Sequence, residues 1–191
     1  NHLLAIKGMQ HSIKDFAELV KKQEKYIQKI KENNRYDSIL YTIQEPILAG
    51  YVFNKVSEIE NEKIRVHYNF AVTTKRIEYI SIFHLNEIIG ILLDNAKEAV
   101  EQMEEARRNI NFHIMETVDK LTIKVTNISE KIEQNRIIEL FKEGYSSKEN
   151  HSGLGLRKIK ELADKYSYDI MPYNQVINNE NHIVFEIVIY K

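Results

Sequence analysis

Two stretches of sequence decide the fold of this chain. They read Leu92-Leu93-Asp94-Asn95-Ala96-Lys97-Glu98-Ala99 and Ser146-Ser147-Lys148-Glu149-Asn150-His151-Ser152-Gly153-Leu154-Gly155-Leu156. The first stretch lies on a predicted amphipathic helix, where Asn95 falls off the apolar stripe beside Asp94 and Glu98. A side-chain oxygen at that position can bind a hard cation such as Mg²⁺. Polar residues beside an apolar stripe more often only face solvent, and that alternative stays open for this stretch alone.

The second stretch is a polar loop that leads through two glycines into a predicted helix. Gly153 and Gly155 leave the backbone bare, so its N–H groups and the positive end of the helix can meet a phosphate. Lys148 can add a mobile positive charge. The alternative is that the two glycines only turn the chain.

Apolar patterns of two periods surround these stretches. Strict alternation predicts strands at 63–70, 110–114, 121–125 and 183–189, with a weaker strand at 168–176. Helical spacing predicts helices from Pro46 to Glu62, over 85–103 and after Gly155. Helices interspersed among about five strands predict an α+β fold, a two-layer sandwich of a mixed sheet and one helical layer.

The first 34 residues follow a different pattern. Apolar side chains keep near-heptad spacing from Phe16 to Ile30, which leaves one seam for a partner helix. We expect a helical pairing segment at 1–34, a linker at 35–45 and the main domain at 46–191. Two helices per chain cannot close a bundle core but four can, so a homodimer is expected. The alternative is one amphipathic helix lying on the main domain.

Composition excludes several classes of protein. Because 27 basic and 28 acidic residues give a net charge of −1, the chain lacks the basic footprint of a nucleic-acid binder. It contains no cysteine, and its histidines show no metal-ligand spacing. No apolar run approaches the ~20 residues of a membrane helix. The chain starts at Asn1 inside a helical pattern, so we expect a fragment whose parent protein can still be membrane-anchored upstream.

The combination of Asp-Asn-Ala-x-x-Ala on one helix with Gly-Leu-Gly-Leu at the start of the next is far more specific for one family than either stretch alone. The pair resembles the Bergerat-type ATP-binding fold shared by gyrase, heat-shock chaperones, sensor histidine kinases and mismatch-repair proteins. The resemblance covers residues 46–190. It implies that Asn95 holds Mg²⁺, that residues 128–152 form a lid over ATP, and that residues 140–146 form its phenylalanine segment. It also implies that the phosphate end is closed by Gly153, Leu154, Gly155 and Leu156.

Two departures from the family pattern narrow the choice among the members of this family. Water-splitting members carry a glutamate four residues before the Mg²⁺ asparagine, but Ile91 stands there and cannot accept a proton. Many relatives carry Asp-x-Gly-x-Gly at the adenine end, where this chain has Asn127-Ile128-Ser129-Glu130-Lys131. The Asn127 amide oxygen can still accept a hydrogen bond from the adenine amino group, or Asn127 can simply end a strand.

Loss of the glycine motif, a short lid and an intact Gly-Leu-Gly-Leu resemble the Agr-type, peptide-sensing quorum kinases. The segment Asn1-His2-Leu3-Leu4 resembles the stretch after the phosphorylated histidine in those kinases and in the sporulation phosphotransferase. By that register residues 1–34 belong to dimerisation and phosphotransfer helices, and the phosphoacceptor lies upstream of Asn1. His2 is then not the nucleophile, and no catalytic residue is assigned within the chain. His151 can touch nucleotide from the lid or remain a solvated loop residue.

The resemblance implies the cytoplasmic catalytic region of a bacterial plasma-membrane sensor histidine kinase. Such a protein binds ATP with Mg²⁺, transfers the γ-phosphoryl to a histidine of its own dimerisation helix, and then to an aspartate of a response regulator, here of the DNA-binding Agr-type class. A non-catalytic phosphorelay scaffold like the sporulation phosphotransferase is the first alternative. An ATP-driven clamp like gyrase is the second, and Ile91 disfavours it.

Overall fold

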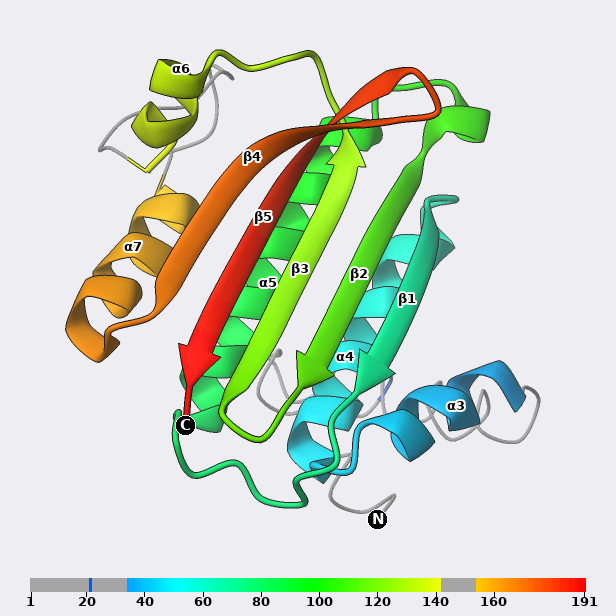
Figure 1. Ribbon diagram of the computed structural model, residues 1–191. Helices are drawn as coiled ribbons and strands as arrows, with labels where there is room; N and C mark the ends of the chain where they lie inside the picture. The colour runs from blue at the N-terminus through cyan, green and yellow to red at the C-terminus, as the bar shows by residue number, and fades with distance from the viewer. Residues whose placement is uncertain (1–20, 22–33, 142–153) are drawn as a thin grey trace.

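A five-stranded sheet organises the chain (Figure 1). The computed structural model describes residue 21, residues 34–141 and residues 154–191. The strands are β1 (Arg65–Ala71), β2 (Asn109–Glu116), β3 (Lys120–Ile128), β4 (Asp169–Ile177) and β5 (Glu180–Tyr190). They lie in the order β1-β2-β3-β5-β4, and β1 runs parallel to β2 while the other pairs are antiparallel. The predicted mixed sheet is therefore confirmed.

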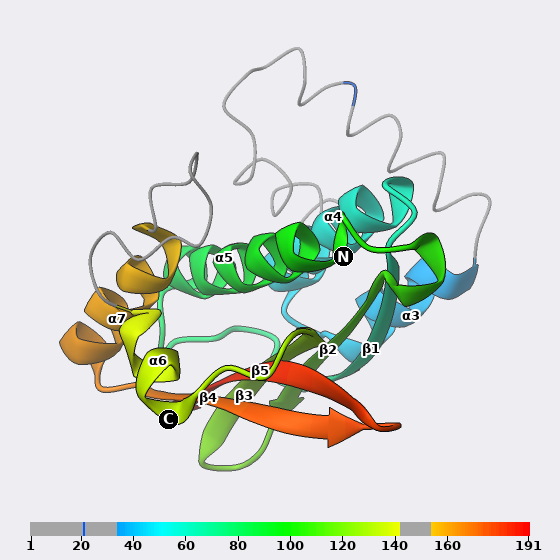
Figure 2. The ribbon, with the colours of Figure 1, turned by 90° about the horizontal axis from the view of Figure 1, so that it is seen from above.

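Helices cover one face of this sheet. The helical elements are α3 (Asn34–Thr42), α4 (Pro46–Asn61), α5 (Ile82–Val100), the 3-10 turn η1 (Glu105–Arg107), α6 (Gln134–Glu139) and α7 (Leu154–Tyr166). Figure 2 shows α4, α5 and α7 on the same side of the strands. Pro46 occupies the first turn of α4, where its missing N–H costs nothing, and Glu45 caps that helix by accepting a hydrogen bond from the Leu48 N–H.

The core lies between the helices and the covered face of the sheet. Alternate residues of β2 and β3 point into it, and Ile110, Phe112, Ile114, Leu121, Ile123 and Val125 are fully buried. The segment 35–45, predicted as a linker, contains most of helix α3. Its Ile39 and Ile43 are buried, and Ile43 forms a parallel bridge to Val72 beyond the end of β1. This segment is therefore packed onto the domain.

The uncovered face of the sheet carries polar side chains among apolar ones such as Val184 and Val188. The Lys124 ammonium lies 5.6 Å from the centre of the Tyr173 ring, and the Tyr173 hydroxyl donates to Glu186 at 3.1 Å. At the rim, β4 forms one edge of the sheet and carries Pro172 opposite Phe185 of β5. No helix among the described residues is long and apolar enough to cross a bilayer.

Candidate nucleotide-binding site

Asn95 lies in the C-terminal half of α5, the long helix that crosses behind β3 and β5 (Figure 1). Its side-chain nitrogen, Nδ2, is enclosed and has no hydrogen-bond partner, whereas its oxygen, Oδ1, is not among the enclosed unpaired atoms. An enclosed unpaired amide nitrogen costs about 1–3 kcal/mol. A cation needs an oxygen ligand, so the amide oxygen is the Asn95 atom that could bind one.

Gly155 brings the start of α7 against the same helix. A Cβ added to Gly155 would lie 3.0 Å from Cγ2 of Ile91, closer than ordinary van der Waals contact. Ile91 and Asn95 are i, i+4 neighbours on α5, so they share one face of the helix. The structure therefore brings Gly155 close to the helix face that carries Asn95. Ile91, which stands where water-splitting relatives hold a base, serves here as the packing surface for Gly155.

Asn127 is the second-last residue of β3 and lies on the covered face of the sheet. It is buried, and it pairs with Ile110 of β2 on one side and Ile183 of β5 on the other. Its Nδ2 donates to the Ile128 carbonyl oxygen at 3.0 Å. That bond fixes the amide with Oδ1 as its free acceptor, which is the group that adenine recognition needs.

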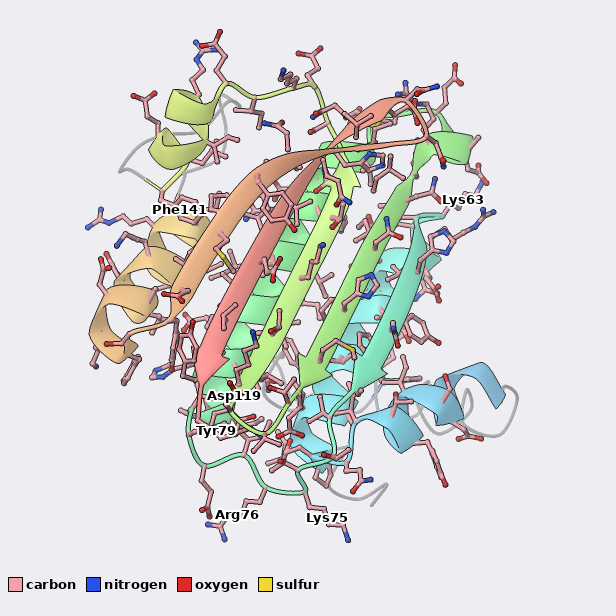
Figure 3. The ribbon with its side chains drawn as sticks, viewed as in Figure 1. Lys63, Lys75, Arg76, Tyr79, Asp119 and Phe141 are labelled. Carbon is pink, nitrogen blue, oxygen red and sulfur yellow. The ribbon has the colours of Figure 1, made fainter. Side chains whose placement is uncertain are left out.

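Two residues from the middle of the predicted lid, Leu140 and Phe141, pack against the sheet and the core. The Phe141 ring meets Phe185 of β5 edge to face, with centroids 6.2 Å apart, and Leu140 also packs on the core. Figure 3 places Phe141 at the α6 side of the molecule, far from Tyr79 and Asp119 at the opposite end of the sheet. Leu140 and Phe141, the described residues of the predicted phenylalanine segment, therefore pack on the helix side of the sheet, against the core and β5.

Two ion pairs join α5 to helix α4 and to the residue that follows α4. Lys55 of α4 pairs with Asp94 at 2.9 Å, and Lys97 pairs with Glu62 at 2.6 Å. The hydrogen bond that the Lys97 ammonium donates to Glu62 raises the pKa of Lys97. Burial, reinforced by the negative charge of Asp94, raises the pKa of Tyr51. These pairs hold α4 against α5, and they leave Asp94, the neighbour of Asn95, already engaged with a cation.

The residues present fit one hard cation with phosphate oxygens, rather than a metal held by the protein alone. The part of the chain that the structure describes holds no group of three or more His, Asp or Glu side chains placed to bind a metal ion. A single amide oxygen suits Mg²⁺, which keeps several waters and takes the rest of its ligands from substrate phosphates. Asn95 supplies such an oxygen.

The predicted site residues Lys148, His151 and Gly153 fall outside the described ranges, as does the predicted helical segment 1–34 apart from residues 21 and 34. Leu154 is the first residue of α7, and Leu156 is partly buried against the core. Sequence reasoning missed two residues close to the site, Asn174 and Asn181, which bind the segment after β3. Asn174 lies in β4, whose sequence has only a weak strand pattern, and Asn181 lies near the start of β5. Neither residue belongs to a motif.

Comparison with known proteins identifies the family of this domain. The family model described as the GHKL domain matches residues 80–190, more than half of the chain, including Asn95, Asn127 and Gly155. The chain therefore belongs to the GHKL-domain family.

Solved structures show the same fold. The nucleotide-free catalytic domain of histidine kinase ThkA superimposes with a TM-score of 0.55 at 16% identity, over 74% of this chain and 90% of that domain. The mycobacterial sensor histidine kinase MprB gives a TM-score of 0.56 at 13% identity, over 73% of this chain and 91% of that structure. The described fold is thus that of histidine kinase catalytic domains.

Two curated relatives are sensor proteins. CitS of Bacillus subtilis (strain 168) is 27% identical over 131 residues, which cover 68% of this chain and 24% of CitS. The probable C4-dicarboxylate sensor kinase of Halalkalibacterium halodurans is 26% identical over 151 residues, which cover 76% of this chain and 28% of that kinase. The chain thus spans only about a quarter of the length of these relatives.

Proposed function

We propose that this chain is the ATP-binding catalytic part of a sensor histidine kinase of a two-component system. It binds ATP with Mg²⁺ so that the γ-phosphoryl passes to a histidine of the dimerisation helices and then to an aspartate of a response regulator. The observation that carries the proposal is Asn95, whose enclosed side-chain nitrogen has no hydrogen-bond partner and which shares a face of α5 with Ile91, the neighbour of Gly155. Membership of the GHKL-domain family supports it.

Each site residue has one role in this proposal. The Asn95 oxygen holds Mg²⁺, which when bound supplies charge neutralisation for the phosphates. The Asn127 oxygen accepts a hydrogen bond from the adenine amino group. Backbone N–H groups from Gly153 to Leu156, at the start of α7, receive the phosphates. Ile91 offers no group to activate water, which favours transfer over hydrolysis.

The finer assignments rest on sequence alone. The segment after Asn127 lacks glycine, which supports the Agr-type, quorum-sensing subgroup and a matching DNA-binding response regulator. The relatives found carry other names, so this subgroup depends on that segment and on residues 1–8. The heptad-like seam of residues 16–30 supports a homodimer, and the sensor relatives support a parent protein anchored in the plasma membrane with this part in the cytoplasm.

Substitution of Asn95 tests the proposal. Asn95→Ala should lower the affinity for ATP in the presence of Mg²⁺ by at least the roughly 10–100-fold that loss of an outer-shell metal partner costs. Asn69→Ala, an exposed asparagine of β1 on the edge far from α7, is the matched control and should bind like the parent. Titration calorimetry with and without Mg²⁺ measures both.

The result also separates the alternatives. Equal binding by Asn95→Ala and the parent would remove Asn95 from the site. A parent that binds no nucleotide at all would favour the phosphorelay scaffold that resembles the sporulation phosphotransferase.

Autophosphorylation tests the register of the N-terminal segment. We expect this chain to bind ATP without labelling itself, because His2 is followed by Leu3 rather than by an acidic residue. Incubation with radiolabelled ATP should give acid-labile label only on a version extended upstream through the expected phosphoacceptor. Label on His2 of the present chain would overturn the register.

A further inference from the structure

The segment that follows β3 is held in place by an asparagine of β4. The Nδ2 of Asn174 donates to the carbonyl oxygen of Ile132 at 2.7 Å, and the N–H of Ile132 donates to Oδ1 of Asn174 at 3.1 Å. One side-chain amide thus satisfies both backbone groups of Ile132, as a residue of a neighbouring strand would. A segment without regular structure is thereby fixed to the sheet edge.

A second asparagine, Asn181 of β5, holds the residues just before. Its backbone oxygen accepts from the Ser129 N–H at 3.0 Å, which continues the β3–β5 ladder one step past the end of β3. Its Nδ2 lies 3.2 Å from the Glu130 carbonyl oxygen, and 3.4 and 3.3 Å from the carbonyl and hydroxyl oxygens of Ser129. The same Nδ2 donates to Oδ1 of Asn174 at 3.1 Å, so the two asparagines form one polar clamp.

The clamp shares a row of the sheet with Asn127. Asn127 of β3 and Asn174 of β4 both pair with Ile183 of β5, one from each side. Directly paired residues point to the same face of a sheet, so Asn127 and Asn174 both project toward the helical layer. Two strand spacings separate their backbones, which is about 9–10 Å. Segment 129–132 therefore runs over this row from β3 to β4 and borders the acceptor assigned to adenine.

We infer that Asn174 and Asn181 are positioning residues for the adenine end of the site. They fix segment 129–132 by hydrogen bonds to its backbone, where a glycine motif would shape it in many relatives. The inference rests on the proposed function. A loop that is ordered beforehand does not lose conformational freedom when the ligand binds, so the clamp should contribute to affinity for the base.

The first measurement compares two ligands that share phosphates but differ in the base. Asn174→Leu and Asn181→Leu remove the amides and keep the branch at Cγ. Each should weaken binding of ATP with Mg²⁺ by roughly tenfold, while binding of inorganic tripolyphosphate with Mg²⁺ stays as in the parent. Asn109→Leu is the matched control, because the Asn109 Nδ2 donates to the Ala106 carbonyl at 3.0 Å on a strand away from the clamp.

Amide exchange supplies the second measurement. Freed from its acceptor, the Ile132 N–H should exchange faster in nucleotide-free Asn174→Leu than in the parent, with β3 amides unchanged. Asn174→Asp keeps the acceptor for that N–H but loses the donor, and should fall between the two proteins. It also serves if Asn174→Leu does not fold.

The outcomes of these experiments distinguish failure of this inference from failure of the proposed function. Three results would each refute the positioning role of the clamp while leaving the proposed function standing. They are faster Ile132 exchange with unchanged ATP affinity, unchanged Ile132 exchange, and equal losses of affinity for ATP and tripolyphosphate. A parent that binds no ATP would instead refute the proposed function, and the inference with it.

Discussion

Glu116, at the end of β2, anchors the loop that joins β1 to α5. Its side chain is only 2% exposed, and it accepts hydrogen bonds from the N–H groups of Thr73 at 2.8 Å and Thr74 at 2.9 Å. The Thr74 hydroxyl also donates to it, and the Lys191 ammonium lies 2.9 Å away. Burial alone would raise the pKa of Glu116, but these donors outweigh burial and lower the pKa from its ordinary value of 4.5 to about 2.

The size and direction of the pH effect follow from that difference. A carboxyl whose pKa is lowered by folding stabilises the native state above its unfolded pKa. That contribution is lost as the pH falls through the folded pKa. With about 1.4 kcal/mol for each pKa unit, the shift to about 2 corresponds to about 3 kcal/mol of unfolding free energy. The window of loss runs from pH 4.5 down to about pH 2.

Glu116→Gln removes this contribution, because the amide keeps one acceptor but turns an N–H toward donors. Urea unfolding at pH 7 should show a loss of about 3 kcal/mol. The gap between parent and variant should then narrow toward pH 2. Glu78→Gln, on the same loop and 72% exposed beside Arg76, should change stability by less than about 1 kcal/mol. A gap between parent and Glu116→Gln that stays constant over this range would refute the reasoning.

Three further substitutions test local packing and backbone strain. A Cβ on Gly90 would lie 2.3 Å from the Tyr51 hydroxyl oxygen. By urea unfolding, Gly90→Ala should therefore cost about 1–3 kcal/mol in the parent but stabilise a Tyr51→Phe background by about 0.5–1 kcal/mol. Gly155→Ala should weaken ATP binding in calorimetry, and Ile91→Ala should restore it by removing the Cγ2 that lies 3.0 Å from the new Cβ. Lys63, labelled in Figure 3, has a φ of 61°, a left-handed conformation that glycine adopts without strain. Lys63→Gly should therefore stabilise the fold by about 1 kcal/mol and raise the midpoint of thermal unfolding, whereas Lys63→Ala should not.

Much of the fold could be predicted because its signals are local. Strict alternation marked β1, β2, β3 and β5, and Pro46 marked the start of α4 within one residue. The expected linker hid helix α3, which is short, and its buried Ile39 and Ile43 are too few to define a helical stripe. Its place in the core depends on contact with the end of β1, which is a tertiary effect.

The candidate site divides in the same way. Asn95, Asn127 and Gly155 belong to motifs with a recognisable order and spacing, and the structure puts all three on the helix side of the sheet. The contact between Gly155 and Ile91, and the clamp of Asn174 and Asn181, join segments more than forty residues apart. Side-chain bonds to a distant backbone leave no periodic pattern in a single sequence, so only the folded chain shows them.

Pro172 has a consequence for how this domain behaves among copies of itself. A sheet edge offers unpaired N–H and C=O groups on which a strand from another molecule can assemble. On β4 the outer row of donors is interrupted at Pro172, which has no N–H to offer, and an incoming strand would meet a gap there. This rim of the sheet is therefore a poor template for the addition of a strand from another copy of the chain.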